Sequence, residues 1–101
     1  MDASAFRPDT RVTATLRESG SVPRPGRFYV LRAHPDFLVV RMADGEGLLR
    51  RIDYGTIERI VETRPIAPGD RMTVPAALLE AGFWKSRSTL AHYGSSAARG
   101  K

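Results

Sequence analysis

Residues 26–61 read GRFYVLRAHPDFLVVRMADGEGLLRRIDYGTIERIV, and this stretch decides the fold. It consists of short apolar and β-branched runs separated by turn-forming residues, a pattern typical of strands. Over 26–33 the side chains alternate between two faces, which predicts a strand. Residues 37–42 (FLVVRM) are almost continuously apolar, which predicts a central strand covered on both faces.

Turn signals separate these strands. His34-Pro35-Asp36 is predicted to be a turn, because proline lacks an N–H donor and restricts the residue before it. Residues 43–47 (ADGEG) contain the Asp-Gly pair that supplies the positive φ of a tight hairpin. Residues 48–53 are predicted to return as a strand, and after Tyr54-Gly55 a further short strand is expected over 56–61.

The flanking residues extend this pattern. Strict alternation over 11–17 (RVTATLR) predicts a half-buried strand, and the Gly-, Ser- and Pro-rich residues 18–26 predict a loop. Residues 62–68 are expected to connect to a final strand over 71–74. Pro75 suits the first position of a helix, Ala76 to Ala81 are helix formers, and Gly82 is a natural stop, so a short helix is expected over 75–82.

The sequence therefore predicts one all-β domain of about five short strands with one short C-terminal helix. We expect a flexible arm over 1–9, the folded domain over 10–93 and a flexible basic tail over 94–101 (GSSAARGK). Residues 84–93 fit a strand or a helix equally well.

Composition excludes several classes of function. The chain of 101 residues has no cysteine, so disulfides, thiolate metal sites and cysteine nucleophiles are absent. The first residues show no apolar signal segment, and no apolar run approaches the roughly 20 residues that a membrane span needs. A soluble cytoplasmic protein is the expectation.

The order of the segments resembles the SH3-like small barrels, and within them the Sm-like branch. Gly26, an alternating strand, a turn containing Asp36 and an apolar strand into Asp44-Gly45 resemble the first Sm motif. Residues 50–60 (RRIDYGTIERI) resemble the shorter second motif of Hfq-type proteins. The resemblance implies a small barrel and self-association through edge strands, hence a homo-oligomer.

Two departures from that pattern concern the base-binding pocket. The Sm family places an asparagine just after the turn aspartate, whereas Val39 and Val40 stand in that region and the chain has no asparagine. The lysine-histidine pair of Hfq-type proteins is also missing, because Tyr54, Gly55 and Thr56 stand there. The family's pocket is therefore not carried over to this chain.

No motif for catalysis, a cofactor or a metal is present. His34 lies in a predicted turn and His92 near the tail, and neither has a ligand partner at metal-binding spacing. Asp44-Gly45-Glu46-Gly47 lacks the end of a phosphate-binding loop and the ligand spacing of a calcium loop. We expect no enzymatic activity, no metal and no cofactor; an enzyme whose site forms only between subunits is the remaining option.

Nucleic-acid binding is the leading functional prediction. The net charge is +5, and 14 of the 16 basic residues are arginine, since only Lys85 and Lys101 are lysine. Barrels that bind single strands combine aromatic stacking with cationic grooves. The residues expected to bind RNA or single-stranded DNA lie on two predicted strands and the turn after them: Arg27, Tyr29, Arg32, Arg50, Arg51 and Tyr54.

Two other interpretations stay open. Acidic residues are interleaved with these arginines, and cross-strand ion pairs on a solvated surface would give the same pattern; a G+C-rich genome would also favour arginine. Alternatively, the domain is a partner-binding or self-assembling adaptor in which exposed strand edges and Phe83-Trp84 form the contact. Against that, large aromatic residues usually serve the core of a small domain.

Overall fold

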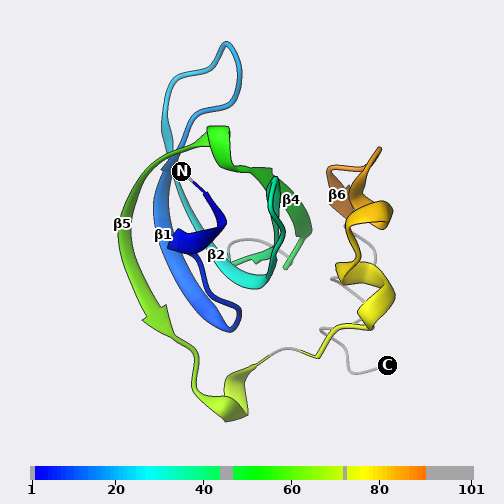
Figure 1. The fold of residues 1–101 in the computed structure, drawn as a ribbon. Helices are drawn as coiled ribbons and strands as arrows, with labels where there is room; N and C mark the ends of the chain where they lie inside the picture. Colours follow the sequence, from blue (N-terminus) through cyan, green and yellow to red (C-terminus); the bar gives the residue numbers. More distant parts are fainter. Residues whose placement is uncertain (1, 44–46, 72, 91–101) are drawn as a thin grey trace.

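A computed structural model describes residues 2–43, 47–71 and 73–90 (Figure 1). Its six strands form one antiparallel sheet in the order β5-β1-β2-β3-β4-β6. The strands are β1 (Thr10–Leu16), β2 (Arg24–Ala33), β3 (Phe37–Met42), β4 (Leu49–Asp53), β5 (Ile57–Pro65) and β6 (Thr89–Leu90). The all-β prediction is confirmed, and the strands predicted over 11–17, 26–33, 37–42 and 48–53 differ from β1 to β4 by two residues or fewer at each end.

The sheet curls around an inner core (Figure 1). Alternation along β1 places Val12, Ala14 and Leu16 inside, as predicted. Bulges between Val30 and Arg32 in β2 and at two points of the β1–β5 pairing increase the bend. The inner core consists of Phe6, Val12, Ala14, Leu16, Phe28, Val30, Leu38, Val40, Ile52, Tyr54 and Ile57.

A second apolar cluster covers the outer face of β3 and β4. Phe37, Val39 and Leu49 project outward from these strands and pack around Trp84, which is fully buried. The segment 73–90 supplies this cover (yellow to orange beside β4 in Figure 1). Burial of β3 on both faces confirms the interpretation of its continuous apolar sequence.

The pairing does not close into a barrel among the described residues. The free edge of β4 is taken by β6, through the pairs Leu49–Leu90 and Arg50–Thr89. β5 follows β4 through the 3-10 turn η2 (Tyr54–Thr56) and pairs with β1 at the far end of the sheet. Closure into a barrel would require β5 to pair with β4, but β6 occupies that edge of β4. β5 therefore lies at one end of an open sheet.

The C-terminal region differs from the prediction. Instead of one helix over 75–82 there are two 3-10 turns, η4 (Ala76–Leu79) and η5 (Ala81–Trp84). They are separated by Glu80, whose backbone is extended (φ −71°, ψ 143°). This break lets Leu78, Phe83 and Trp84 all reach the outer cluster, which a single short helix would not present together.

The final strand predicted over 71–74 is also wrong. The described residues there, Arg71, Thr73 and Val74, belong to no strand. Instead β5 continues through Glu62 to Pro65, a stretch predicted to be a connector, and pairs with β1 along its length. Pro65 is tolerated because it ends an edge strand, where no ladder hydrogen bond depends on its nitrogen. A 3-10 turn, η3 (Pro68–Asp70), follows.

Residues 2–9, predicted to be an arm, lie against the sheet. The 3-10 turn η1 (Ala3–Ala5) is capped by the Asp2 carboxylate, and Phe6 is buried in the inner core against Tyr54. Asp9 N–H donates to the Val30 carbonyl at 2.9 Å. The turn at 34–36 is confirmed by a 2.9 Å bond from His34 N–H to the Phe37 carbonyl.

Parts of the sequence prediction fall outside the described residues. The Asp44-Gly45-Glu46 centre of the expected hairpin does so, although its flanks pair through a 2.8 Å bond from Met42 N–H to the Leu48 carbonyl. The predicted tail over 94–101 and residues 91–93 lie outside as well. Within 84–90, the chain leaves η5 and pairs as β6, so the undecided segment contains the end of a 3-10 turn and a short strand.

Candidate nucleic-acid interface

The six residues predicted to bind nucleic acid do not share one surface. Tyr54 lies in the inner core with 6% of its surface exposed, and its hydroxyl donates to the His34 carbonyl at 2.6 Å. Burial, with smaller effects from Asp2 and Asp36, raises the pKa of Tyr54. The ring stacks on Phe6 at 5.8 Å, so it presents no free face to a base.

Arg50 and Arg51 on β4 have partners within the chain. Arg50 forms an ion pair with Glu18. Arg51 Nε lies 2.8 Å from Asp53 Oδ1, and its Nη1 donates to the Trp84 carbonyl at 2.8 Å. The Arg51 guanidinium also lies 4.4 Å above the centre of the Phe37 ring. The Arg51 bond to the Trp84 carbonyl ties the segment 73–90 to the sheet.

The three β2 residues divide at the bulge. Tyr29 and Arg27 both project from the outer face, and Arg27 is exposed. Arg32 lies beyond the bulge, opposite Val39, and does not line the cleft that contains Tyr29. Tyr29 is therefore the predicted residue around which a site can be built.

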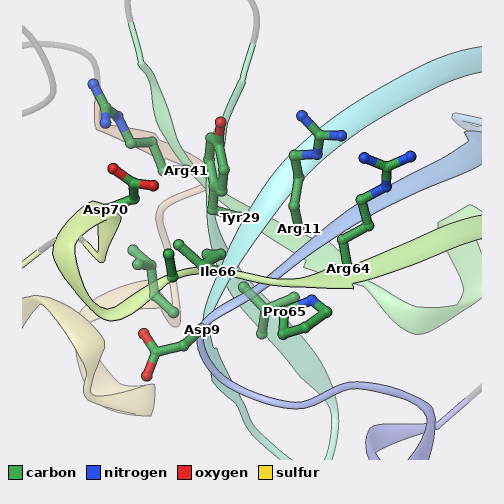
Figure 2. Close-up of a pocket in the computed structure, with 11 residues that line it drawn as sticks. Asp9, Arg11, Tyr29, Arg41, Arg64, Pro65, Ile66 and Asp70 are labelled. Carbon is green, nitrogen blue, oxygen red and sulfur yellow. The ribbon is translucent and has the colours of Figure 1, made fainter.

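A row of four residues crosses four neighbouring strands at Tyr29. Arg64 of β5 pairs with Arg11 of β1, Arg11 pairs with Tyr29 of β2, and Tyr29 pairs with Arg41 of β3. Directly opposed residues in an antiparallel sheet project from the same face. Figure 2 shows the four side chains extending to the same side of the sheet. We call this set the Arg-Tyr row.

The Arg-Tyr row forms the wall of a cleft of about 520 Å³. That volume is within the usual range for small-ligand sites, roughly 300–1,000 Å³. Pro65 and Ile66 lie at its base, and Asp70 of η3 borders it on the side of Arg41 (Figure 2). Asp9 also lines the cleft, but its side chain extends away from the four side chains of the Arg-Tyr row (Figure 2), and its carboxylate lies 3.8 Å from the Arg71 guanidinium.

The arginines of this row are incompletely neutralised. Arg64 Nε lies 2.9 Å from Glu62 Oε2, whereas neither Arg11 nor Arg41 has an ion-pair partner among the described residues. Arg41 Nε is buried without a hydrogen-bond partner. Directly opposed like charges on a sheet are destabilising, so the Arg11–Arg64 pair gains from an anion placed between the two guanidinium groups.

Gly47 shapes the position of Arg41. Gly47 has φ +73°, and a Cβ built there would lie 2.5 Å from Arg41 Nε. Glycine therefore serves two needs at once: it adopts the left-handed backbone and leaves room for the guanidinium.

A second cleft, of about 460 Å³, lies between β4 and residues 85–89. It contains Arg50 and Arg51, with Lys85 and Arg87 across from them. The β4 arginines in this cleft are paired with acids, as described above, and Arg87 lies 4.6 Å from the centre of the Phe83 ring. Two of its four cations are thus neutralised, whereas, in the portion of the chain that the structure describes, Arg64 alone is paired among the three arginines of the Arg-Tyr row.

Phe83 and Trp84, the predicted partner anchors, serve the outer cluster. Trp84 is 0% exposed, and its indole Nε1 donates to the Leu78 carbonyl at 2.7 Å. Phe83 is half-buried and packs edge-on against Trp84 at 5.4 Å. Trp84 is therefore a core residue, which was the alternative interpretation of the sequence, and its buried ring cannot contact a partner at the surface.

Other site chemistries find no support in the part of the chain that the structure covers. His34 Nε2 lies 2.7 Å from the Leu79 carbonyl and its ring contacts Phe37; His92 is outside the described residues. Those residues contain no group of three or more side chains suited to a metal ion. Nor do they include a helix long and apolar enough to cross a bilayer.

Sequence reasoning missed Arg11, Arg41 and Arg64 as site residues. A signal existed for Arg11, because the alternation over 11–17 puts it on the polar face of its strand. Arg41 stands in an apolar run, and Arg64 in a stretch predicted to be a connector. Only the register across four strands brings them together with Tyr29.

Comparison with protein-family models, curated proteins and solved structures finds no significant match to this chain. The resemblance to SH3/Sm-like barrels therefore stays a prediction.

Proposed function

We propose that this protein binds single-stranded nucleic acid, RNA or DNA, on the outer face of β5, β1, β2 and β3. The observation that carries the proposal is the Arg-Tyr row, in which one aromatic ring lies between Arg11 and Arg41, two arginines with no ion-pair partner among residues 2–43, 47–71 and 73–90. Single-strand binding combines stacking of a base on an aromatic ring with phosphate contacts by cationic groups. Arginine's planar fork suits a phosphate in particular.

The competing interpretation, a mixed-charge surface, accounts for other arginines of the chain. Arg17 pairs with Glu58, Arg50 with Glu18 and Arg51 with Asp53. It does not account for Arg11, whose cross-strand neighbours are Tyr29 and Arg64. The proposal therefore moves the binding surface from β4 to the Arg-Tyr row and keeps Tyr29 from the sequence prediction, with Arg27 exposed on the same strand but outside the cleft.

Fluorescence anisotropy of a labelled twelve-nucleotide strand, titrated at several salt concentrations, tests the proposal. We expect binding that weakens as salt rises, because each phosphate contact contributes about 0.7 to the logarithmic salt slope of a single strand. Tyr29→Ala should weaken binding by roughly 5- to 150-fold, from a stacking contribution of about 1–3 kcal/mol. Arg11→Gln should weaken binding and lower the salt slope.

Arg17→Gln is the matched control, since Arg17 follows the same strand but is paired with Glu58. It should bind like the wild type. Absence of binding at low salt, or equal losses in Arg11→Gln and Arg17→Gln, would refute the proposal.

Self-association through β5 is a second candidate function, supported by a separate observation. β5 lies at one end of the sheet order, and most of its residues are exposed, including Val61 at 57%. An unpaired strand edge is a template for pairing with another chain. Light scattering should give a mass above that of one 11.1 kDa chain, and Val61→Pro should return it to the monomer. A monomer at all protein concentrations would refute this candidate.

A further inference from the structure

The cleft of the Arg-Tyr row has two chemically different ends. Arg11 and Arg64 lie side by side at one end, Arg41 and Asp70 lie at the other, and Tyr29 stands between them (Figure 2). Asp70 is held in place by η3, where its N–H donates to the Ala67 carbonyl at 2.8 Å. Its carboxylate has no ion-pair partner in the described part of the chain.

The carboxylate sets the direction in which a nucleotide can lie. A phosphate beside Asp70 would meet a like charge, whereas a phosphate beside Arg11 and Arg64 would meet two cations. The phosphate therefore belongs at the Arg11–Arg64 end. The base then extends past Tyr29 and over the apolar surface of Pro65 and Ile66, toward Asp70 and Arg41.

Asp70 and Arg41, at the end of the cleft where the nucleobase would lie, can distinguish between the four nucleobases. A carboxylate accepts two hydrogen bonds side by side, and guanine alone presents two adjacent N–H donors, N1 and N2, on its Watson–Crick edge. Adenine and cytosine present one donor beside an acceptor there, and uracil or thymine presents one donor between two carbonyls. Arginine also donates well to guanine O6 and N7, and the Arg41 side chain lines the same end of the cleft as Asp70 (Figure 2).

We propose that Asp70 and Arg41 make this cleft selective for guanine, in which N1 and N2 of the base donate to the Asp70 carboxylate and a phosphate lies between Arg11 and Arg64. This inference rests on the proposed function, because it names the base that the same cleft accepts. It requires no chemical step, only recognition.

The test uses four labelled hexanucleotides with one central G, A, C or U in a uridine background, and a fifth with inosine. The full chain should bind the G strand about 5- to 100-fold more tightly than the A, C and U strands, as expected for a good bidentate base contact. Inosine lacks the N2 amino group, so its strand should bind less tightly than the G strand.

Asp70→Asn replaces one acceptor oxygen by a donor and removes the charge, and it should abolish the preference for G while the other strands still bind. Glu80→Gln is the matched control, because Glu80 is an exposed acid outside the cleft, and it should keep the preference. Equal affinities for all strands would overturn the guanine inference and leave single-strand binding standing. A preference for G that is retained in Asp70→Asn would also overturn the guanine inference alone. If the wild-type protein bound none of the strands, the guanine inference and the proposed single-strand binding would both be overturned.

Discussion

Replacing Trp84 by alanine is expected to remove most of the packing that holds residues 73–90 on the sheet. Trp84 is fully buried among Phe37, Val39 and Leu49, and its indole N–H satisfies the Leu78 carbonyl. A buried tryptophan truncated to alanine costs about 3–5 kcal/mol. A domain of this size has a total unfolding free energy of roughly 5–15 kcal/mol, so the loss is a large fraction of the whole.

The assay is urea unfolding followed by far-UV circular dichroism, since Trp84 is the only tryptophan and its fluorescence is lost in the variant. With an m-value on the order of 1–2 kcal/mol/M, the midpoint should fall by about 1.5–5 M. Trp84→Phe, which keeps an aromatic ring but loses the hydrogen bond to Leu78, should lose less than half as much. A loss below about 1 kcal/mol in Trp84→Ala would refute the packing of this segment on β3 and β4.

Three further predictions concern stability. Gly26→Ala should lower the free energy of unfolding in urea by about 1–3 kcal/mol, because an added Cβ would lie 2.6 Å from a Leu16 methyl. Gly55→Ala is the control: an added Cβ there has nothing within 4 Å, so its unfolding free energy should stay within about 0.5 kcal/mol of wild type. Gly47→Ala should lower the melting temperature through a left-handed backbone strain of about 1–2 kcal/mol, and an unchanged melting temperature would contradict the assigned φ. Burial raises the pKa of Tyr54 above its ordinary value of 10.0. The stability that this residue contributes is therefore complete below about pH 10 and is lost as pH rises through the higher folded pKa. Tyr54→Phe should weaken the alkaline loss of stability, and identical pH profiles of stability for the two proteins would count against the raised pKa.

The strands that could be predicted are those whose pattern is local. Alternation over 11–17 and the continuous apolar run over 37–42 each indicate both a strand and its faces, and the structure has both. The C-terminal segment could not be predicted in this way, because its conformation depends on where Leu78, Phe83 and Trp84 must go. Local helix propensity over 76–81 was overruled by contacts with Phe37 and Val39.

The site was predictable only in part for the same reason. Tyr29 was predicted from alternation on its own strand. Tyr54 has the same aromatic character in the sequence, yet the turn η2 directs it into the inner core. Arg41 and Arg64 join Tyr29 through pairings between strands far apart in the chain, and the register of such pairings is set by bulges that no local pattern reveals.

The most direct test of the central claim is backbone NMR of the labelled protein titrated with the guanine-containing hexanucleotide. We predict that the largest chemical-shift changes fall on Arg11, Tyr29, Ile66 and Asp70, which surround one cleft. Changes confined to β4 and residues 85–89, around the second cleft, would contradict the claim that the Arg-Tyr row binds the strand.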